Sequence, residues 1–294
     1  MKNKITVYLV DDDIDDRMFT REALESVLEG VSVEEFSDGI ELLRALHETE
    51  RASEPALIML DINLPMINGL DLLSAIKRKP TLCHIPVVLL STSSDSETIK
   101  KAYQTGVNAY FIKPVSVFEY KKIAHVAVSC FVNAKRSLLI PNKLASQKAT
   151  NILVIEDNAD HWDLMQLAMA RLENVRFFHR ESAEATLEFL ESSFADPARR
   201  IDLVILDLYL PGRQHGLDLI EAIRALFIQQ MMAPVPILVF SASDHHDDIK
   251  ASYQRRANAY ITKSYDVKQS AFYLNDLCNL WATTIAMPKV APGV

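Results

Sequence analysis

The sequence predicts an α/β fold in which two doubly wound, five-stranded parallel sheets follow one another along the chain. Three observations support this prediction. Short apolar runs alternate with longer amphipathic stretches, which is the order of strands and crossover helices in a parallel sheet. The runs 57–60 and 87–90 are apolar at every position, as expected for strands whose two faces are both covered by helices. The whole pattern then occurs a second time, beginning near residue 150.

The first copy contains five apolar runs that we expect to be strands, near residues 5–10, 31–36, 57–60, 86–90 and 108–112. Runs of this length are typical of buried parallel strands when turn residues bound them. The stretches between them have the spacing of amphipathic helices, and the last expected helix covers residues 116–136. Ser93, Ser94 and Asp95 precede the fourth helical stretch and carry the side chains of an N-cap.

The second copy repeats these elements in the same order. Its expected strands lie near residues 151–155, 175–178, 201–206, 235–240 and 258–261. Its last helix is expected over residues 266–286, and Ser243 with Asp244 has the pattern of an N-cap. We therefore expect a first domain at 1–136, a polar linker at 137–149, a second domain at 150–286 and a C-terminal tail at 287–294.

Composition is that of a globular protein. The 294 residues are 49% hydrophobic, which is enough for two cores of ordinary size. No long charge-free apolar run is present, so we expect no membrane span. A strand begins close to the N-terminus, so we expect no signal peptide, and the three scattered cysteines lack CxxC spacing. These features predict a cytoplasmic protein without disulfides or thiolate metal sites.

The charge distribution argues against direct binding of nucleic acid. Residues 1–149 contain 18 Lys and Arg against 20 Asp and Glu, a net charge of −2, and the remaining residues contain 13 against 19, a net charge of −6. Neither half has the basic surplus that contacts with a phosphate backbone need.

Polar side chains stand at the ends of four strands in the first copy: Asp11 and Asp12, Asp61, Ser91 and Lys113. Ligands of a doubly wound sheet bind beyond the carboxyl ends of its strands. The three carboxylates can supply oxygen ligands to Mg²⁺, which would screen Asp61 for attack on an anionic phosphorus. The hydroxyl and ammonium groups can contact the phosphoryl oxygens, on which negative charge develops. The pattern therefore predicts a divalent-metal phosphoryl site.

The second copy carries the same chemistry at matched positions: Glu156, Asp157, Asp207, Ser241 and Lys263. The serine and the lysine are separated by 22 residues in both copies. The second acid of the acidic pair precedes the strand-end aspartate by 49 residues in the first copy and by 50 in the second. A single Asp at a strand end is often only a helix cap, and a Lys-Pro pair is often only a turn. Capping alone does not account for four polar elements at matched strand ends in both copies.

A calcium loop is a less favoured interpretation of the first acidic run. Asp11, Asp13 and Asp15 have the alternate spacing of such a loop, and Glu22 stands at its twelfth position. The run nevertheless follows a strand, and Asp16 occupies the position where the loop needs Gly.

Three further features have simpler interpretations. His245 and His246 are adjacent, so their side chains diverge, and no third metal ligand is near them in the sequence; a solvated loop is favoured. Tyr110 and Tyr260 each lie three residues before the lysine. They are either aromatics at the edge of the core or residues with a further role, and the pattern leaves both open.

Together these residues resemble the receiver domain of two-component response regulators, over nearly the whole chain as two tandem receivers of flavodoxin-like fold. In the first copy the motifs that match are Asp11-Asp12, residues 61–69 (DINLPMING), Ser91 and residues 110–114 (YFIKP). The resemblance implies that Asp61 is the phospho-acceptor and that Asp11 and Asp12 are metal acids. It also implies that Ser91 and Tyr110 form a switch pair and that Lys113 binds the phosphoryl group, with a cis peptide at Lys113–Pro114.

The second copy departs from the family pattern at several positions. Glu156 stands for the first acid, Tyr209 occupies the position of Asn63, and residues 211–216 are one residue longer than residues 65–69. Ser264 replaces the proline after Lys263, so a trans peptide is expected there. The corresponding roles would fall to Asp207 as acceptor, Glu156 and Asp157 as metal acids, Ser241 and Tyr260 as switch pair and Lys263 as phosphoryl-binding lysine.

The resemblance implies a response regulator in a two-component phosphorelay. A sensor histidine kinase or a histidine phosphotransfer protein would donate the phosphoryl group to Asp61 and Asp207, with Mg²⁺ as cofactor, and output would occur by protein–protein contact or onward phosphotransfer. A homodimer through the face of the fourth helix, fifth strand and fifth helix is a further implication. The alternatives are a metal-dependent aspartyl phosphohydrolase, which would need a second acid and a cap that short loops cannot build, and a binding scaffold with inactive sites.

Overall fold

The apolar runs of the first copy form the strands β1 (Thr6–Val10), β2 (Ser32–Phe36), β3 (Leu57–Asp61), β4 (Val87–Ser91) and β5 (Ala109–Ile112). All of their pairings are parallel, in the order β2-β1-β3-β4-β5. The computed structural model describes residues 5–49, 54–132, 150–170, 172, 174–264, 273–274, 277–278, 281 and 283–288. Every residue of β3 and β4 is buried, so both faces of the sheet are covered, as the sequence predicts.

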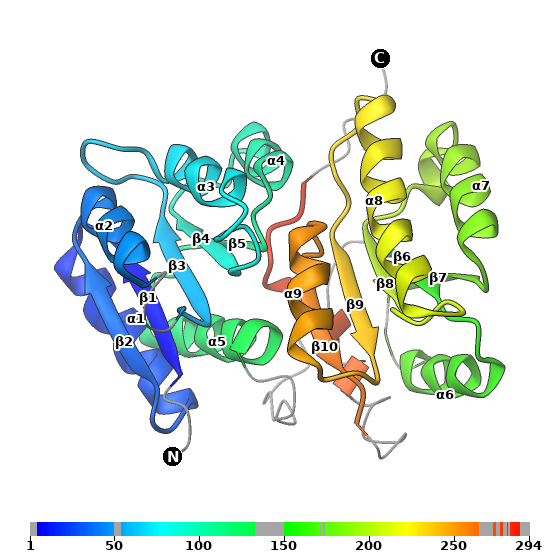
Figure 1. Cartoon of the computed structure of the whole chain (residues 1–294), viewed down its shortest axis with the longest axis horizontal. Helices are drawn as coiled ribbons and strands as arrows, with labels where there is room; N and C mark the ends of the chain where they lie inside the picture. Colours follow the sequence, from blue (N-terminus) through cyan, green and yellow to red (C-terminus); the bar gives the residue numbers. More distant parts are fainter. Residues whose placement is uncertain are drawn as a thin grey trace. The chain divides into compact units, whose positions relative to one another are not determined.

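The helices of the first domain are α1 (Ile14–Val27), α2 (Gly39–Thr49), α3 (Gly69–Arg78), α4 (Ser96–Thr105) and α5 (Val117–Ala127), followed by a π-helical turn at Val128–Val132. Polar side chains cap several helix N-termini because the first amides of a helix have no partner within it. Asp13 caps α1, Asn68 caps α3, and Asp95 caps α4 as the sequence predicts. In Figure 1, α1 and α5 lie together, and α3 lies beside α4.

The second domain repeats this topology with β6 (Thr150–Ile155), β7 (Val175–Arg180), β8 (Leu203–Leu206), β9 (Ile237–Ser241) and β10 (Ala259–Thr262). The strands are parallel in the order β10-β9-β8-β6-β7, which is the order of the first sheet counted from its other edge. The helices are α6 (Ala159–Met169), α7 (Ala183–Phe194), α8 (Arg213–Gln229) and α9 (His246–Gln254), with a 3₁₀ turn at Pro197–Arg199. The two flavodoxin-like sheets of the sequence prediction are therefore confirmed.

The end of the second domain is described only in part. Tyr273, Leu274, Leu277, Cys278 and Trp281 are helical and buried, which agrees with a helix in the expected range 266–286. The expected linker at 137–149 and most of the tail at 287–294 lie outside the described residues. The chain divides into two units at Met1–Ala134 and Lys135–Val294. None of the helices in the described ranges has the length and apolar character needed to span a bilayer.

Two local expectations are wrong. Among the described residues the cis peptide bond is Leu210–Pro211, so Lys113–Pro114 is not cis, whereas Lys263–Ser264 is trans as expected. In the second domain α9 is preceded by His245, whose side chain makes no capping bond, and not by a Ser243–Asp244 cap. Ser243 instead directs its hydroxyl to Asp248, a buried acid in the first turn of α9.

Candidate functional site

The polar strand ends of the first domain meet at the carboxyl edge of the sheet, where strand order reverses between β1 and β3. The register pairs Val10 with Leu60, so Asp11 and Asp61 leave neighbouring strands at the same level. Both carboxylates are almost fully buried, with exposed fractions of 1% and 3%. Two anions this close in a buried place need a cation between or beside them.

Lys113 supplies that cation in the structure. Its Nζ lies 2.8 Å from Asp11 Oδ2, 2.7 Å from Asp61 Oδ2 and 2.8 Å from Asp16 Oδ2. Tyr120 Oη donates a 2.6 Å hydrogen bond to the other oxygen of Asp16. The sequence interpretation brings Asp11, Asp61 and Lys113 together but misses Asp16 and Tyr120. Asp16 could have been found, because it lies in the first turn of the helix that follows the strand-end acids.

The electrostatics of this cluster follow from burial and from the lysine. Burial raises the pKa of Asp11 to about 6, against the opposing effect of Lys113. Burial alone would lower the pKa of Lys113, but hydrogen bonds to Asp11, Asp16 and Asp61 outweigh it and raise that pKa above its ordinary value. The lysine is therefore firmly charged, and the buried Asp11 carboxylate is protonated more readily than a carboxylate in water.

Backbone groups fix the direction of both buried carboxylates. The amide of Asn63 donates to Asp61 Oδ1 at 3.1 Å, and the amide of Asp13 donates to Asp11 Oδ1 at 3.0 Å. The loop after β3 turns back so tightly that a Cβ at Gly69 would lie 2.1 Å from the carbonyl oxygen of Asp61. Only glycine fits this approach, which allows α3 to begin directly beside the carboxylate.

The residues of the expected switch pair are both buried. Ser91 has no exposed surface, and its Oγ accepts a 3.1 Å bond from the amide of Ser93. Tyr110 is also fully buried, and its hydroxyl donates to the carbonyl of Ser93 at 2.8 Å. The tyrosine therefore already points inward, because a hydrogen-bond acceptor is available to its hydroxyl there.

The second domain builds a similar cluster with fewer carboxylates. Lys263 Nζ lies 2.8 Å from Glu156 Oε2 and 2.8 Å from Asp207 Oδ2. Glu156 and Asp207 have exposed fractions of 2% and 9%. Ser241 has no exposed surface, and Tyr260 donates to the carbonyl of Ser243 at 2.9 Å, as its counterpart does in the first domain. Burial raises the pKa of Tyr260 to about 12.

Among the described residues, each domain holds one group of side chains that could bind a metal ion. In the first domain the group is Asp11, Asp12 and Asp61, the acids named from the sequence, and Asp12 is exposed. In the second domain the group is Glu156, His161 and Asp207. Carboxylate oxygens are the ligands that hard divalent cations such as Mg²⁺ prefer, so the first set fits such an ion.

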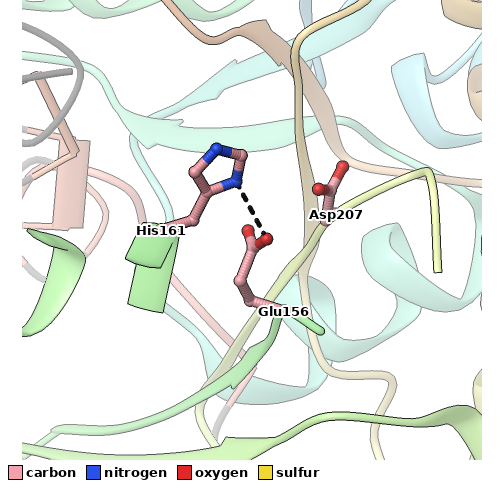
Figure 2. A group of neighbouring side chains, drawn as sticks. All are labelled: Glu156, His161 and Asp207. Atoms are coloured by element: carbon pink, nitrogen blue, oxygen red, sulfur yellow. Dashed lines mark hydrogen bonds and ion pairs between the residues drawn. The ribbon is translucent and has the colours of Figure 1, made fainter. Parts of the chain in front are cut away.

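His161 is a further residue that sequence reasoning missed, in addition to Asp16 and Tyr120. Figure 2 shows its ring facing Glu156, with Asp207 beside them, and its Nδ1 lies 3.1 Å from Glu156 Oε1. Asp157, the expected metal acid, is exposed and is not part of this group, so its role stays a prediction. The repeat offered a signal, because His161 follows Glu156 by five residues just as Asp16 follows Asp11.

A polar network lies next to the second site, and the described residues of the first domain show no matching network. Asp248 accepts a 2.9 Å hydrogen bond from the Tyr209 hydroxyl, pairs with Arg213 Nε and accepts a bond from the Ser243 hydroxyl. Helix α8 begins at Arg213, three residues before Gly216, whereas α3 begins at Gly69 itself. Helix α8 therefore includes the three residues before Gly216, and Arg213 at its start pairs with Asp248. This network joins the loop after β8 to the loop after β9.

Neither of the two alternative sets of metal ligands forms a cluster among the described residues. Asp13 accepts hydrogen bonds from the amides of Asp15 and Asp16 and so caps α1. His245 and His246 stand at the start of α9 and belong to neither group of candidate ligands.

Comparison with known proteins points to one family for both halves of the chain. Residues 7–125 and 152–271 both match the family described as response regulator receiver domain. The probable methanogenesis regulatory protein FilR2 of Methanothrix harundinacea is 37% identical over 119 residues, which are 40% of this chain and 76% of that protein. Response regulator Rcp1 of Synechocystis is 34% identical over 110 residues, which are 36% of this chain and 75% of that protein.

Solved structures with related sequences include the phosphorylated cyanobacterial phytochrome response regulator RcpA. It is 33% identical, with a TM-score of 0.42, over 45% of this chain and 96% of that chain. The Mn²⁺-bound form of Rcp1 is 28% identical, with a TM-score of 0.41, over 47% of this chain and 99% of that chain. Because the family match occurs twice and covers most of the sequence, the chain belongs to the response regulator receiver family, with two receiver domains in tandem.

Proposed function

We propose that Asp61 and Asp207 each accept a phosphoryl group from the phosphohistidine of a sensor histidine kinase or a histidine phosphotransfer protein. The observation that supports this most directly is the lysine that bridges a strand-end acceptor and a buried neighbouring acid in both domains. In the transfer, a carboxylate oxygen of the Asp forms a bond to phosphorus while the bond from phosphorus to the donor imidazole nitrogen breaks. The lysine then neutralises a phosphoryl oxygen.

In the first domain Asp11, Asp12 and Asp61 would hold Mg²⁺. When bound, the ion neutralises the carboxylates and lets an anionic phosphoryl group approach. The hydroxyl of Ser91 would hydrogen-bond a phosphoryl oxygen, and Lys113 would contact another. In the second domain Ser241 and Lys263 would have these roles, and Glu156, Asp157 and Asp207 are the acids proposed for the cation.

The receiver surface is proposed to transmit the signal by protein–protein contact or by onward phosphotransfer. Near the first site the β5–α5 segment carries four exposed apolar side chains, Ile112, Val115, Val117 and Phe118. Exposed apolar clusters of this kind mark contact surfaces. They support the proposal of a homodimer through α4, β5 and α5. The net charge of −8 supports a protein partner and not a nucleic acid. Because the proposed donors act in the cytoplasm, a cytoplasmic location is part of the proposal.

A metal-dependent phosphohydrolase is the less favoured function. It would need a general acid for the leaving group and a cap that encloses a substrate. In the first domain only residues 62–68 separate β3 from α3, which is too short for a cap. A scaffold with inactive sites is the other alternative, and it predicts no modification at all.

The test is covalent labelling by a small phosphodonor. Acetyl phosphate with Mg²⁺ should raise the intact mass by up to two phosphoryl groups, and chelation of the metal should abolish the increase. Asp61→Asn and Asp207→Asn should each remove one group, and the double variant should remove both. Asp15→Asn, which changes an exposed acid near the first site, is the matched control and should label like the wild type. Full labelling of the double variant would refute the assignment.

A further inference from the structure

We infer that the second receiver binds its divalent cation with His161 as a ligand and therefore selects Mn²⁺ and similar transition ions over Mg²⁺. The inference rests on the proposed cation site at Glu156 and Asp207 and deepens it. The candidate ligand atoms of Glu156, His161 and Asp207 all lie within 4.8 Å of one another. The group is built from the end of β6, the first turn of α6 and the end of β8, so three elements converge on one point.

The carboxylates of this site have oxygens that Lys263 does not use. Lys263 contacts Glu156 Oε2 and Asp207 Oδ2, both at 2.8 Å. The other oxygen of Glu156 faces Nδ1 of His161 at 3.1 Å, and Figure 2 shows the imidazole directed toward this carboxylate. A cation bound beside Lys263 would therefore meet one nitrogen and two carboxylate groups.

The backbone places His161 at this point. Asn158 caps α6, and its side-chain oxygen accepts a 3.0 Å bond from the amide of His161. The first turn of the helix is thus fixed two residues after Glu156. The His161 side chain is 43% exposed, so it can turn to a ligand without disturbing the core.

The first receiver provides the internal contrast. The position that corresponds to His161 is Asp16, which contacts Lys113 and Tyr120 and does not join the group formed by Asp11, Asp12 and Asp61. The candidate ligand atoms of the first receiver are all oxygens, whereas the group in the second receiver includes an imidazole nitrogen. The two sites therefore differ in donor chemistry and not only in geometry.

Donor chemistry decides which ion each site prefers. Mg²⁺ binds oxygen ligands in octahedral geometry and gains little from imidazole. Mn²⁺ and the later first-row ions accept imidazole nitrogen, and their affinity for mixed nitrogen and oxygen sites increases along the series. The first site should accordingly be served by Mg²⁺, and the second by Mn²⁺ or a later ion when these are present.

The chain contains a built-in optical probe for the second site. Its two tryptophans, Trp162 and Trp281, both lie in the second domain. Trp162 adjoins His161 and stacks on His179 at 4.1 Å between ring centroids, and His179 bonds to the backbone carbonyl of Glu156. Paramagnetic Mn²⁺ in this site should therefore quench the fluorescence of Trp162.

The experiment is a titration of the full chain with Mn²⁺, with and without excess Mg²⁺, followed by tryptophan fluorescence and by the electron paramagnetic resonance of free Mn²⁺. We expect Mg²⁺ to displace Mn²⁺ from the first site more readily than from the second. His161→Ala should raise the Mn²⁺ concentration needed for half-maximal quenching by about tenfold or more. It should leave the Mg²⁺ affinity nearly unchanged. His245→Ala, which changes an exposed histidine outside the site, should behave like the wild type.

Unchanged Mn²⁺ affinity in His161→Ala, with the fold intact by urea denaturation, would overturn the inference. His161→Gln gives a second, larger replacement, and the same result with it would have the same meaning. Failure of the proposed function is distinguishable. If Asp207 takes no phosphoryl group with either ion, while Mn²⁺ binding depends on His161, the acceptor assignment fails and the metal selectivity stands.

Discussion

Removal of the Asp248 carboxylate should destabilise the second domain. Asp248 is 4% exposed and holds the loops after β8 and β9 together through Tyr209, Arg213 and Ser243. Burial acts to raise its pKa, but hydrogen bonds from Ser243, Arg213 and Tyr209 outweigh it and hold the pKa of Asp248 below its ordinary value of 3.8. The folded domain thus stabilises the ionised acid.

The size of the loss follows from the contacts. A hydrogen bond to a charged group contributes about 1.5 to 3 kcal/mol. Arg213 and Tyr209 are 39% and 40% exposed, so both side chains return to water when the acid is removed. Water then replaces part of their hydrogen bonding, so each of these two bonds contributes less to the loss of stability than this full amount. We therefore expect Asp248→Ala to lower the free energy of unfolding by about 2 to 3 kcal/mol.

Urea denaturation followed by tryptophan fluorescence measures this loss, because both tryptophans report on the second domain. With a urea dependence of about 2 kcal/mol per molar, the midpoint should fall by about 1 to 1.5 M. Asp247→Ala is the matched control, since it removes an exposed acid from the same helix turn and has the same effect on the helix dipole.

Equal midpoints for Asp248→Ala and Asp247→Ala would refute the reasoning. The pH dependence gives a second check with Asp248→Asn. Because the folded-state pKa lies below 3.8, the extra stability of the wild type is complete above that pH and is lost as the pH falls through the folded-state pKa. The difference between wild type and Asp248→Asn should therefore shrink on acidification, and a difference that grows would count against the charged network.

Four further predictions concern both domains. Arg256 has a φ of 66° where the first domain has Gly106, so Arg256→Gly should stabilise the second domain by about 0.5 to 1 kcal/mol in the same urea assay. The pKa of Asp11 is about 6, so protons should compete with Mg²⁺ for the first site below that pH. The Mg²⁺ affinity, measured by calorimetry in Asp207→Asn, should fall by up to about tenfold per pH unit below pH 6. An affinity that stays constant over this range would contradict the prediction. The acyl phosphates on Asp61 and Asp207 should hydrolyse at different rates in the two single Asp→Asn variants, because Tyr209 and Ala242 replace Asn63 and Thr92 beside the acceptor. Phosphorylation should change amide exchange over residues 91–122, where Ser91 and Tyr110 lie; an unchanged pattern in fully labelled protein would exclude the switch.

Much of the fold could be read from the sequence because the relevant signals are local. Apolar runs of four to six residues, such as Leu57–Asp61 and Val87–Ser91, have no polar face, and only strands covered on both sides bury them fully. Their order along the chain restricts the topology, since parallel strands need crossover helices. The placement of Asp11, Asp61 and Lys113 at one edge follows from that topology alone.

The tertiary structure decided the contacts that depend on side-chain direction and loop length. Asp16 and His161 occupy corresponding positions, yet Asp16 contacts Lys113 and His161 contacts Glu156, because a carboxylate pairs with the lysine and an imidazole pairs with the acid. The inserted residue before Gly216 could be counted in the sequence, but only the structure shows that α8 lengthens and brings Arg213 to Asp248. A strand pattern fixes which residues reach an edge of the sheet. It does not fix which of them touch, because that depends on rotamers and on loops whose conformations are set by distant parts of the chain.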